Sequence, residues 1–202
     1  MRIRTAFVSC CTCLLLLGAL TNCSAGSGEQ TTAAPSATTA TTERSTTAES
    51  TSVTIEVSSS AFEPGGTIPQ QYAGEGQNIS PPVQWSGLPE GTRELALICD
   101  DPDAPRPTPF VHWVVYKIPA TLRGFPEGST QGAIEGTNDA GRTGYSGPMP
   151  PVGSGVHHYH FRVYALDEEL GAAAGLTKDQ LLEAMEGHIL GEGELVGTYE
   201  RK

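Results

Sequence analysis

Hydrophobic and polar positions follow strand-like patterns in four segments of the chain. Val53–Val57 alternates apolar and polar side chains, as a half-buried strand does. Glu94–Asp100 is a short apolar run, and Phe110–Ile118 is a second run rich in aromatic and β-branched residues, so we predict two buried strands there. His157–Leu166 alternates again. One of its faces carries Tyr159, Phe161, Val163 and Ala165, and the other carries His158, His160, Arg162 and Tyr164.

One later segment has the spacing of a helix. Thr177 and Gln180 are placed as a capping box, and the glycines at 187 and 191 are expected to stop the helix. Its apolar positions are Leu181, Leu182, Met185 and Ile189. Glu194–Glu200 is predicted to close the chain as a strand. Several strands with one late helix predict a mainly antiparallel β domain at 53–202.

The N-terminal residues have the sequence pattern of an export signal and are not expected to belong to the folded domain. Residues 1–23 form a signal peptide, with a positive start, an apolar stretch and a bacterial lipobox that ends at Cys23. Lipid on Cys23 would attach the protein to the outer face of a bacterial cell membrane. Asn22 departs from the small residue usual before that cysteine, so an ordinary cleaved signal peptide and secretion stay open as the alternative.

Residues 24–52 are rich in serine and threonine and contain little that can be buried, which predicts a disordered linker. The chain carries 12 Lys and Arg against 23 Asp and Glu, for a net charge of -11. This acidic balance argues against nucleic acid as a partner, because a phosphate backbone needs a basic surface. Cys99, at the end of an apolar strand, is expected to be a small buried core residue.

Two loops rich in proline and glycine carry polar residues to the ends of predicted strands. The first supplies Asp101 and Asp103, and the second, Gly144–Gly155, leads into His157 and Tyr159. If these strand ends meet, they form a small pocket of carboxylates, imidazoles and a phenol that can donate to an anion. The aspartates would orient the histidines and raise their pKa.

His112 lies in the strand between the two loops, and alternation places it on the face opposite Trp113. Each of these residues also has a purely structural interpretation: the aspartates can cap turns before proline, and His112 can be a satisfied core histidine. The closely spaced His157, His158 and His160 suggest a metal, but alternation separates the first from the other two. No metal site and no cofactor are therefore predicted.

The motifs taken together resemble the phosphatidylethanolamine-binding protein family, in its bacterial Raf kinase inhibitor-like branch. They cover nearly all of 53–202 in the order that the family has. The resemblance implies a large antiparallel β-sheet packed against a smaller sheet, with few peripheral helices. The matching segments are Asn78–Trp85, Asp101–Pro105, Val111–Pro119, Asn138–Pro148, His157–Asp167 and Leu195–Tyr199.

The resemblance also implies a pocket for phosphate or a phosphorylated head group. Carried onto this chain, the ligand-binding residues are Asp101, Asp103, Pro105, His112, Gly147, Pro148, His157 and Tyr159. The function expected from it is that of a non-enzymatic lipoprotein that binds a small anionic or phosphorylated ligand.

Two other functions stay open at this point. One is a protein-interaction module that inhibits a kinase or a protease through exposed loops such as Leu122–Arg142. The other is a weak hydrolase that uses aspartate and histidine with water. The sequence contains no Gly-x-Ser-x-Gly motif, P-loop or dinucleotide-binding fingerprint to favour a particular enzyme class.

Overall fold

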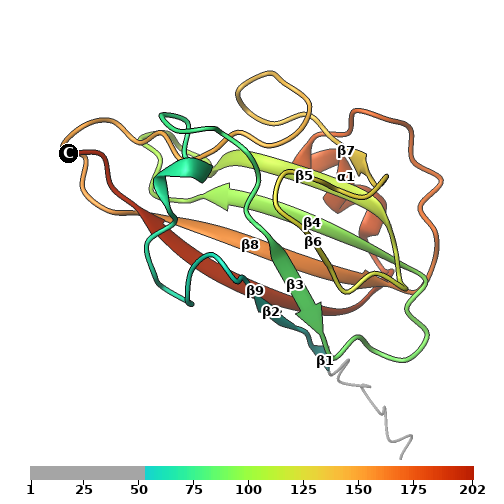
Figure 1. Ribbon diagram of the computed structural model, residues 1–202. Helices are drawn as coiled ribbons and strands as arrows, with labels where there is room; N and C mark the ends of the chain where they lie inside the picture. Colours follow the sequence, from blue (N-terminus) through green and yellow to red (C-terminus); the bar gives the residue numbers. More distant parts are fainter. Residues whose placement is uncertain (1–52) are drawn as a thin grey trace, which may run out of the picture. The chain divides into compact units, whose positions relative to one another are not determined.

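The computed structural model describes residues 53–202, which fold as two β-sheets with one α-helix (Figure 1). The larger sheet has the strand order β1-β9-β8-β4-β5-β7, and the smaller has the order β2-β3-β6. The strands of the larger sheet are β1 (Val53–Thr54), β4 (Glu94–Asp101), β5 (Phe110–Pro119), β7 (Ile134–Glu135), β8 (His157–Leu166) and β9 (Ile189–Tyr199). This arrangement confirms the predicted mainly β fold with a large and a small sheet.

The smaller sheet is formed by β2 (Glu56–Ser58), β3 (Val83–Ser86) and β6 (Gly124–Phe125). A short 3-10 helix, η1, spans Gln70–Tyr72, and the helix α1 spans Lys178–Met185. The pairs within both sheets are antiparallel except that β1 runs parallel to β9. The segment Leu122–Arg142, which was expected to form exposed loops, contains β6 and β7, which have two residues each.

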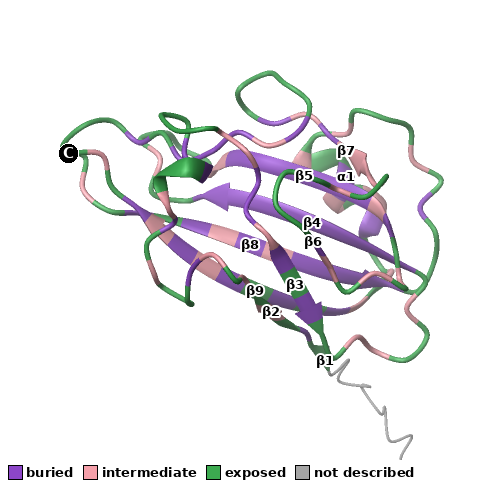
Figure 2. Cartoon of the chain, viewed as in Figure 1, coloured by how far each residue is buried: buried purple, intermediate pink, exposed green. Residues whose placement is uncertain are grey.

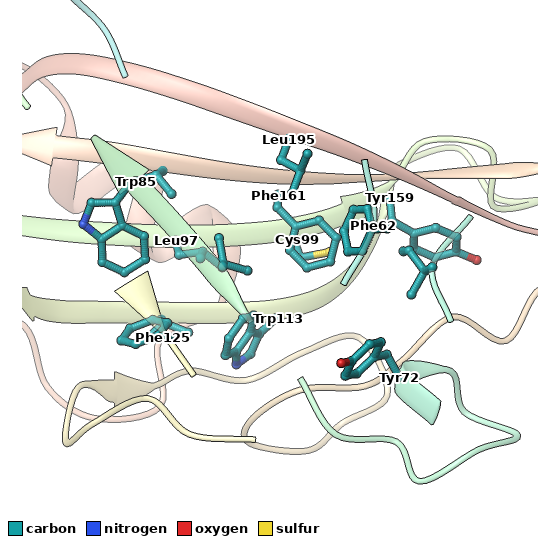
Figure 3. Packing of buried hydrophobic residues seen from close by; sticks show 14 of the residues in the cluster. Phe62, Tyr72, Trp85, Leu97, Cys99, Trp113, Phe125, Tyr159, Phe161 and Leu195 are labelled. Carbon is teal, nitrogen blue, oxygen red and sulfur yellow. The ribbon is translucent and has the colours of Figure 1, made fainter. Parts of the chain in front are cut away.

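Two cores lie on opposite faces of the larger sheet. The first fills the space between the two sheets, and Figure 3 shows Cys99, Trp113 and Phe161 packed together there. The second lies between the larger sheet and α1, where Leu181 and Met185 are fully buried. Cys99 is thus the buried core residue that was predicted, and burial raises the pKa of its thiol well above the usual value.

Strand β4 has one core on each of its two faces and is buried at all eight positions (Figure 2). This explains its unbroken apolar sequence, since a strand covered on both faces has no solvent side to fill with polar residues. β8 keeps the alternation that was predicted. Its residues Tyr159, Phe161, Val163 and Ala165 all belong to the core between the sheets, whereas Tyr164 belongs to the other core.

Two predicted boundaries are wrong. Val53–Val57 is not one strand: the chain leaves the larger sheet after β1, crosses at Ile55 and joins the smaller sheet as β2. The helix begins with the Thr177 capping box and ends before Gly187, as predicted, and the φ of 83° at Gly187 suits glycine; the extension of the helix to Ile189 is what is wrong. Ile189 therefore belongs to β9 and not to the helix, and Gly191 lies within that strand.

The glycines of β9 allow the segment Val53–Ile55, which crosses from the larger to the smaller sheet, to lie directly against that strand. A Cβ on Gly193 would overlap the carbonyl oxygen of Ile55, and a Cβ on Gly191 would overlap that of Val53. The amide of Ile55 donates to the carbonyl oxygen of Glu192 at 2.8 Å, which holds the crossing segment against the strand. The crossing between the two sheets thus depends on β9 having no side chain at these positions.

We expect Gly193→Ala to lower the free energy of unfolding by about 1–3 kcal/mol, the usual cost of forcing an extra carbon into a packed site. Gly171→Ala is the matched control, because a Cβ at Gly171 has no other atom within 4 Å and its φ is not positive. Chemical denaturation of the two variants measures the difference. Equal stability of the two would contradict this account of the crossing.

The predicted signal peptide, its lipobox cysteine Cys23 and the linker at 24–52 lie outside the described residues. Among residues 53–202, the one α-helix is too short and too polar to cross a membrane.

Candidate functional site

A small pocket forms where β4 ends and where β5 and β8 begin, and it has a volume of about 150 Å³. Six of the eight residues predicted to bind a ligand line it: Asp101, Pro105, His112, Gly147, His157 and Tyr159. The two proline- and glycine-rich loops do meet there, as their positions at the strand ends suggested. The sequence analysis missed the other lining residues, which are Ala104, Phe110, Ser146, Met149, Pro150 and Pro151.

Asp101 and His157 form a buried pair on one side of the pocket. The Nδ1 atom of His157 lies 2.7 Å from Oδ2 of Asp101, and the two side chains are only 3% and 5% exposed. The other carboxylate oxygen of Asp101 accepts the backbone N–H of Asp103 at 2.8 Å. Both oxygens of Asp101 are therefore engaged, and the carboxylate holds the proton of His157 on Nδ1, which leaves Nε2 for other partners.

His112 lies beside Tyr159 and not on the face opposite Trp113, so that prediction is wrong. Its ring contacts the Tyr159 ring edge-on at 5.0 Å, and Tyr159 lies in the same core as Trp113. The cause is a bulge: Cys99 pairs with Trp113 and Asp100 with Val111, so His112 has no partner of its own in β4.

The chemistry of His112 also differs from the expectation. Its Nδ1 donates to the carbonyl oxygen of Ser146 at 2.5 Å, and its side chain is nine-tenths or more buried. Burial lowers the pKa of His112, although the Ser146 carbonyl and nearby Asp101 act in the opposite direction. The predicted rise of the pKa therefore does not occur at His112, and the neutral ring presents Nε2 as an acceptor.

Tyr159 lines the pocket, and its hydroxyl oxygen is itself buried. The side chain is 1% exposed, and within residues 53–202 its hydroxyl has no hydrogen-bond partner. Burial raises the pKa of Tyr159, so the phenol stays neutral and remains a donor. A buried, unpaired hydroxyl costs free energy, and a ligand acceptor in the pocket would remove that cost.

Asp103 and Pro148 do not line the pocket. Asp103 accepts from both the backbone N–H and the Nδ1 of His158, at 2.8 and 2.7 Å, on the protein surface. Its pKa is lowered chiefly by the hydrogen bond from His158. The expectation that Asp103 orients a pocket histidine is thus wrong, because its partner is the exposed His158. Pro148 lies behind the wall, where its carbonyl oxygen accepts the N–H of Gly74 at 2.8 Å.

Gly147 joins the pocket to the segment that contains η1. Its N–H donates to Oδ1 of Asn78 at 2.7 Å, and a Cβ on Gly147 would overlap the carbonyl oxygen of Tyr72. The wall next to Gly147 is mainly apolar and is formed by Met149, Pro150 and Pro151. The pocket therefore combines a few polar groups with hydrophobic walls, which is the usual composition of a small-molecule site.

No three His, Cys, Asp or Glu side chains within the described part of the chain come together in a group that could hold a metal ion.

The chain matches the family model for phosphatidylethanolamine-binding protein over residues 58–200. It belongs to this family. Among its relatives, a UPF0098 protein of Methanothermobacter thermautotrophicus is 49% identical over 147 residues, which cover 70% of this chain and 95% of the relative. A UPF0098 protein of Chlamydia muridarum is 44% identical and covers 73% of this chain.

Solved structures of family members have the same fold. A phosphatidylethanolamine-binding protein homolog of Chlamydia trachomatis is 42% identical, matches 74% of this chain and 99% of its own, and has a TM-score of 0.70. E. coli YbcL is 33% identical, matches 73% of this chain and 99% of its own, and has a TM-score of 0.69. The family assignment made from the sequence motifs is thus confirmed.

The different partners of the two aspartates can be tested in solution. We expect Asp101→Asn to redistribute the ring proton of His157 between its two nitrogens, because the carboxylate that fixes it on Nδ1 is lost. Asp103→Asn is the control, since its side chain contacts His158 instead. Nitrogen NMR shifts of the imidazoles report the tautomers, and an equal effect of both variants on His157 would contradict the geometry.

Proposed function

We propose that this protein binds a small anionic or phosphorylated ligand in the pocket at the ends of β4, β5 and β8. The observation that carries the proposal is the buried, unpartnered hydroxyl of Tyr159 beside the imidazoles of His112 and His157. All three residues line one cavity; the Tyr159 hydroxyl is a donor as it stands, and each imidazole becomes a donor to an anion when its Nε2 is protonated. The name of the family, whose lipid has a phosphorylated head group, agrees with this chemistry.

The charge of the pocket makes such binding dependent on protons. Asp101 contributes a negative charge, and each neutral imidazole has already given its Nδ1 proton to a protein acceptor. An anion therefore gains a charged partner only when Nε2 of His112 or His157 takes up a second proton. We infer that the ligand binds together with one or two protons.

The volume and the walls limit the ligand. A space of about 150 Å³ holds a phosphate group with a short organic substituent. The aromatic ring of Phe110 and the side chain of Met149 give that substituent an apolar contact surface. Binding without turnover is the role that we propose for this ligand.

We also propose that the domain acts outside the cytoplasm, attached to the membrane through lipid on Cys23. The support is the lipobox at Leu20–Cys23 and the serine- and threonine-rich segment that separates it from the domain. An acidic body is repelled by anionic lipids, so attachment would depend on the acyl chains.

The attachment predicts a simple fractionation result. In a bacterial host, wild-type protein should sediment with membranes, and Cys23→Ser should move it to the soluble fraction, because the lipid acceptor is lost. Cys99→Ser is the control, since that thiol is buried in the core. Equal distribution of wild type and Cys23→Ser would contradict the lipid anchor.

Proton-linked binding predicts tighter binding of an anion in acid. Sulfate is a suitable probe because its charge is constant between pH 5.5 and 7.5. Each proton taken up with the anion strengthens binding by up to about tenfold per pH unit, so we expect the affinity to rise as the pH falls, by at most about a hundredfold per proton over this range. Isothermal titration calorimetry in two buffers of different ionisation enthalpy measures both the affinity and the proton uptake.

Three variants complete this experiment. Replacing His112 and His157 together by alanine should remove sulfate binding and its pH dependence, whereas Tyr159→Phe should weaken binding and keep the pH dependence. His188→Ala is the control, because this half-exposed histidine pairs with Asp167 and Glu168 outside the pocket. Unchanged sulfate affinity in a folded double variant would overturn the proposed function.

A further inference from the structure

A serine, a histidine and an aspartate form a continuous hydrogen-bonded chain, and the histidine and the aspartate line the pocket. The hydroxyl oxygen of Ser154 lies 3.0 Å from Nε2 of His157, and Nδ1 of the same ring lies 2.7 Å from the Asp101 carboxylate. The two ring nitrogens thus connect a hydroxyl to a carboxylate. This is the arrangement in which a histidine, oriented by an acid, removes the proton from a serine nucleophile.

The position of Ser154 is suited to attack on a molecule from outside. Ser154 is exposed, whereas His157 and Asp101 are buried beneath it. It lies between Gly153 and Gly155, whose φ angles are 77° and 90°. Neither glycine has an atom within 4 Å of a Cβ built on it, so the space around the serine is open. A substrate can therefore reach the hydroxyl without moving the backbone.

The hydroxyl proton of Ser154 has two acceptors. The hydroxyl donates to the carbonyl oxygen of Pro151 at 2.8 Å, and it can rotate to donate to Nε2 of His157 instead. The first arrangement suits a doubly protonated His157, because Nε2 then carries a proton of its own. The second suits the neutral ring, and it is the one that activates the serine.

Acyl transfer also needs a donor for the oxyanion and a site for the acyl chain, and two features near Ser154 suit these roles. Within residues 53–202 the backbone N–H of Gly155 makes no hydrogen bond, and the N–H that follows a nucleophilic serine is a common oxyanion donor. The apolar walls of the pocket, with Phe110 and Met149, begin at Pro151 next to the serine and can hold a short acyl chain.

We propose that Ser154 is a nucleophile for acyl transfer from small, uncharged carboxylic esters, with His157 as general base and Asp101 as the positioning residue. A bond forms between the serine oxygen and the ester carbonyl carbon while the serine proton moves to Nε2. The bond to the alcohol then breaks, and the alcohol leaves with that proton or, if acidic enough, as its anion. Water, activated by the same imidazole, releases the acid and restores the serine.

This activity goes beyond the proposed binding role but uses the same imidazole. An anion in the pocket gains a charged donor when His157 is protonated, whereas acyl transfer needs the neutral ring. Sulfate is therefore expected to slow acylation of Ser154, most strongly at low pH. Acylation measured without sulfate, and sulfate binding measured without ester, fail independently of each other.

The full chain incubated with 4-nitrophenyl acetate tests the proposal. Early in the reaction, before water releases the acid, we expect an acetyl group that peptide mass spectrometry assigns to Ser154. General-base catalysis typically contributes a factor of about 10² to 10⁴, so Ser154 should react about a hundredfold or more faster than another exposed serine. Ser129 is that internal reference, because its hydroxyl accepts the backbone N–H of Gln131 and contacts no histidine.

Three variants decide the outcome. Ser154→Ala should abolish the fast acetylation, His157→Gln should slow it about a hundredfold, and Ser129→Ala should leave it unchanged. Thermal melting of each variant checks the fold, and the mapping of the acetyl group on wild type does not depend on any variant. An acetyl group elsewhere than Ser154, or a rate at Ser154 equal to that at Ser129, would overturn the proposal even where sulfate binding is intact.

Discussion

Strand β4 is covered on both faces, yet it ends in two aspartates. Because adjacent residues of a strand point to opposite faces of the sheet, the two carboxylates lie on opposite sides. Asp100 and Asp101 are 1% and 3% exposed, and a buried carboxylate is tolerated only where a partner offsets the cost of leaving water. Asp100 is paired with Arg162 and Lys178, and Asp101 with His157. Much of the structure around the end of β4 serves to supply these partners.

The two pairings have different consequences. Arg162 and Lys178 both contact the Asp100 carboxylate, and Lys178 is the first residue of α1, so the Asp100 network ties the helix to the end of β4. His157 meets Asp101 with only one of its two ring nitrogens, so the pocket side of the same strand end keeps a second polar atom, Nε2, for other partners. The chemistry of the pocket is therefore a consequence of using an imidazole, rather than a guanidinium, to compensate Asp101.

The sequence predicted the two loops and the strands that they connect, because alternation and proline content are local properties. Half of the residues that line the pocket were predicted, and two of these, Pro105 and Gly147, came from the family resemblance. The position of His112 could not be predicted, since it depends on a bulge in the pairing of β4 with β5. The partner of Asp103 was also out of reach, because either adjacent histidine can meet a carboxylate from a neighbouring loop. The same holds for Ser154, whose contact with His157 depends on how a glycine-rich turn folds back.

The proposed anion binding and the proposed acyl transfer are compatible in one pocket because they would use opposite protonation states of His157. When the ring is doubly protonated, Nε2 is a charged donor that attracts an anion, and the Ser154 hydroxyl is directed to Pro151. When the ring is neutral, Asp101 repels an anion and Nε2 accepts the serine proton. A ligand that brings its own proton would favour the first state, and a neutral ester favours the second, so the protonation of one imidazole selects between the two activities.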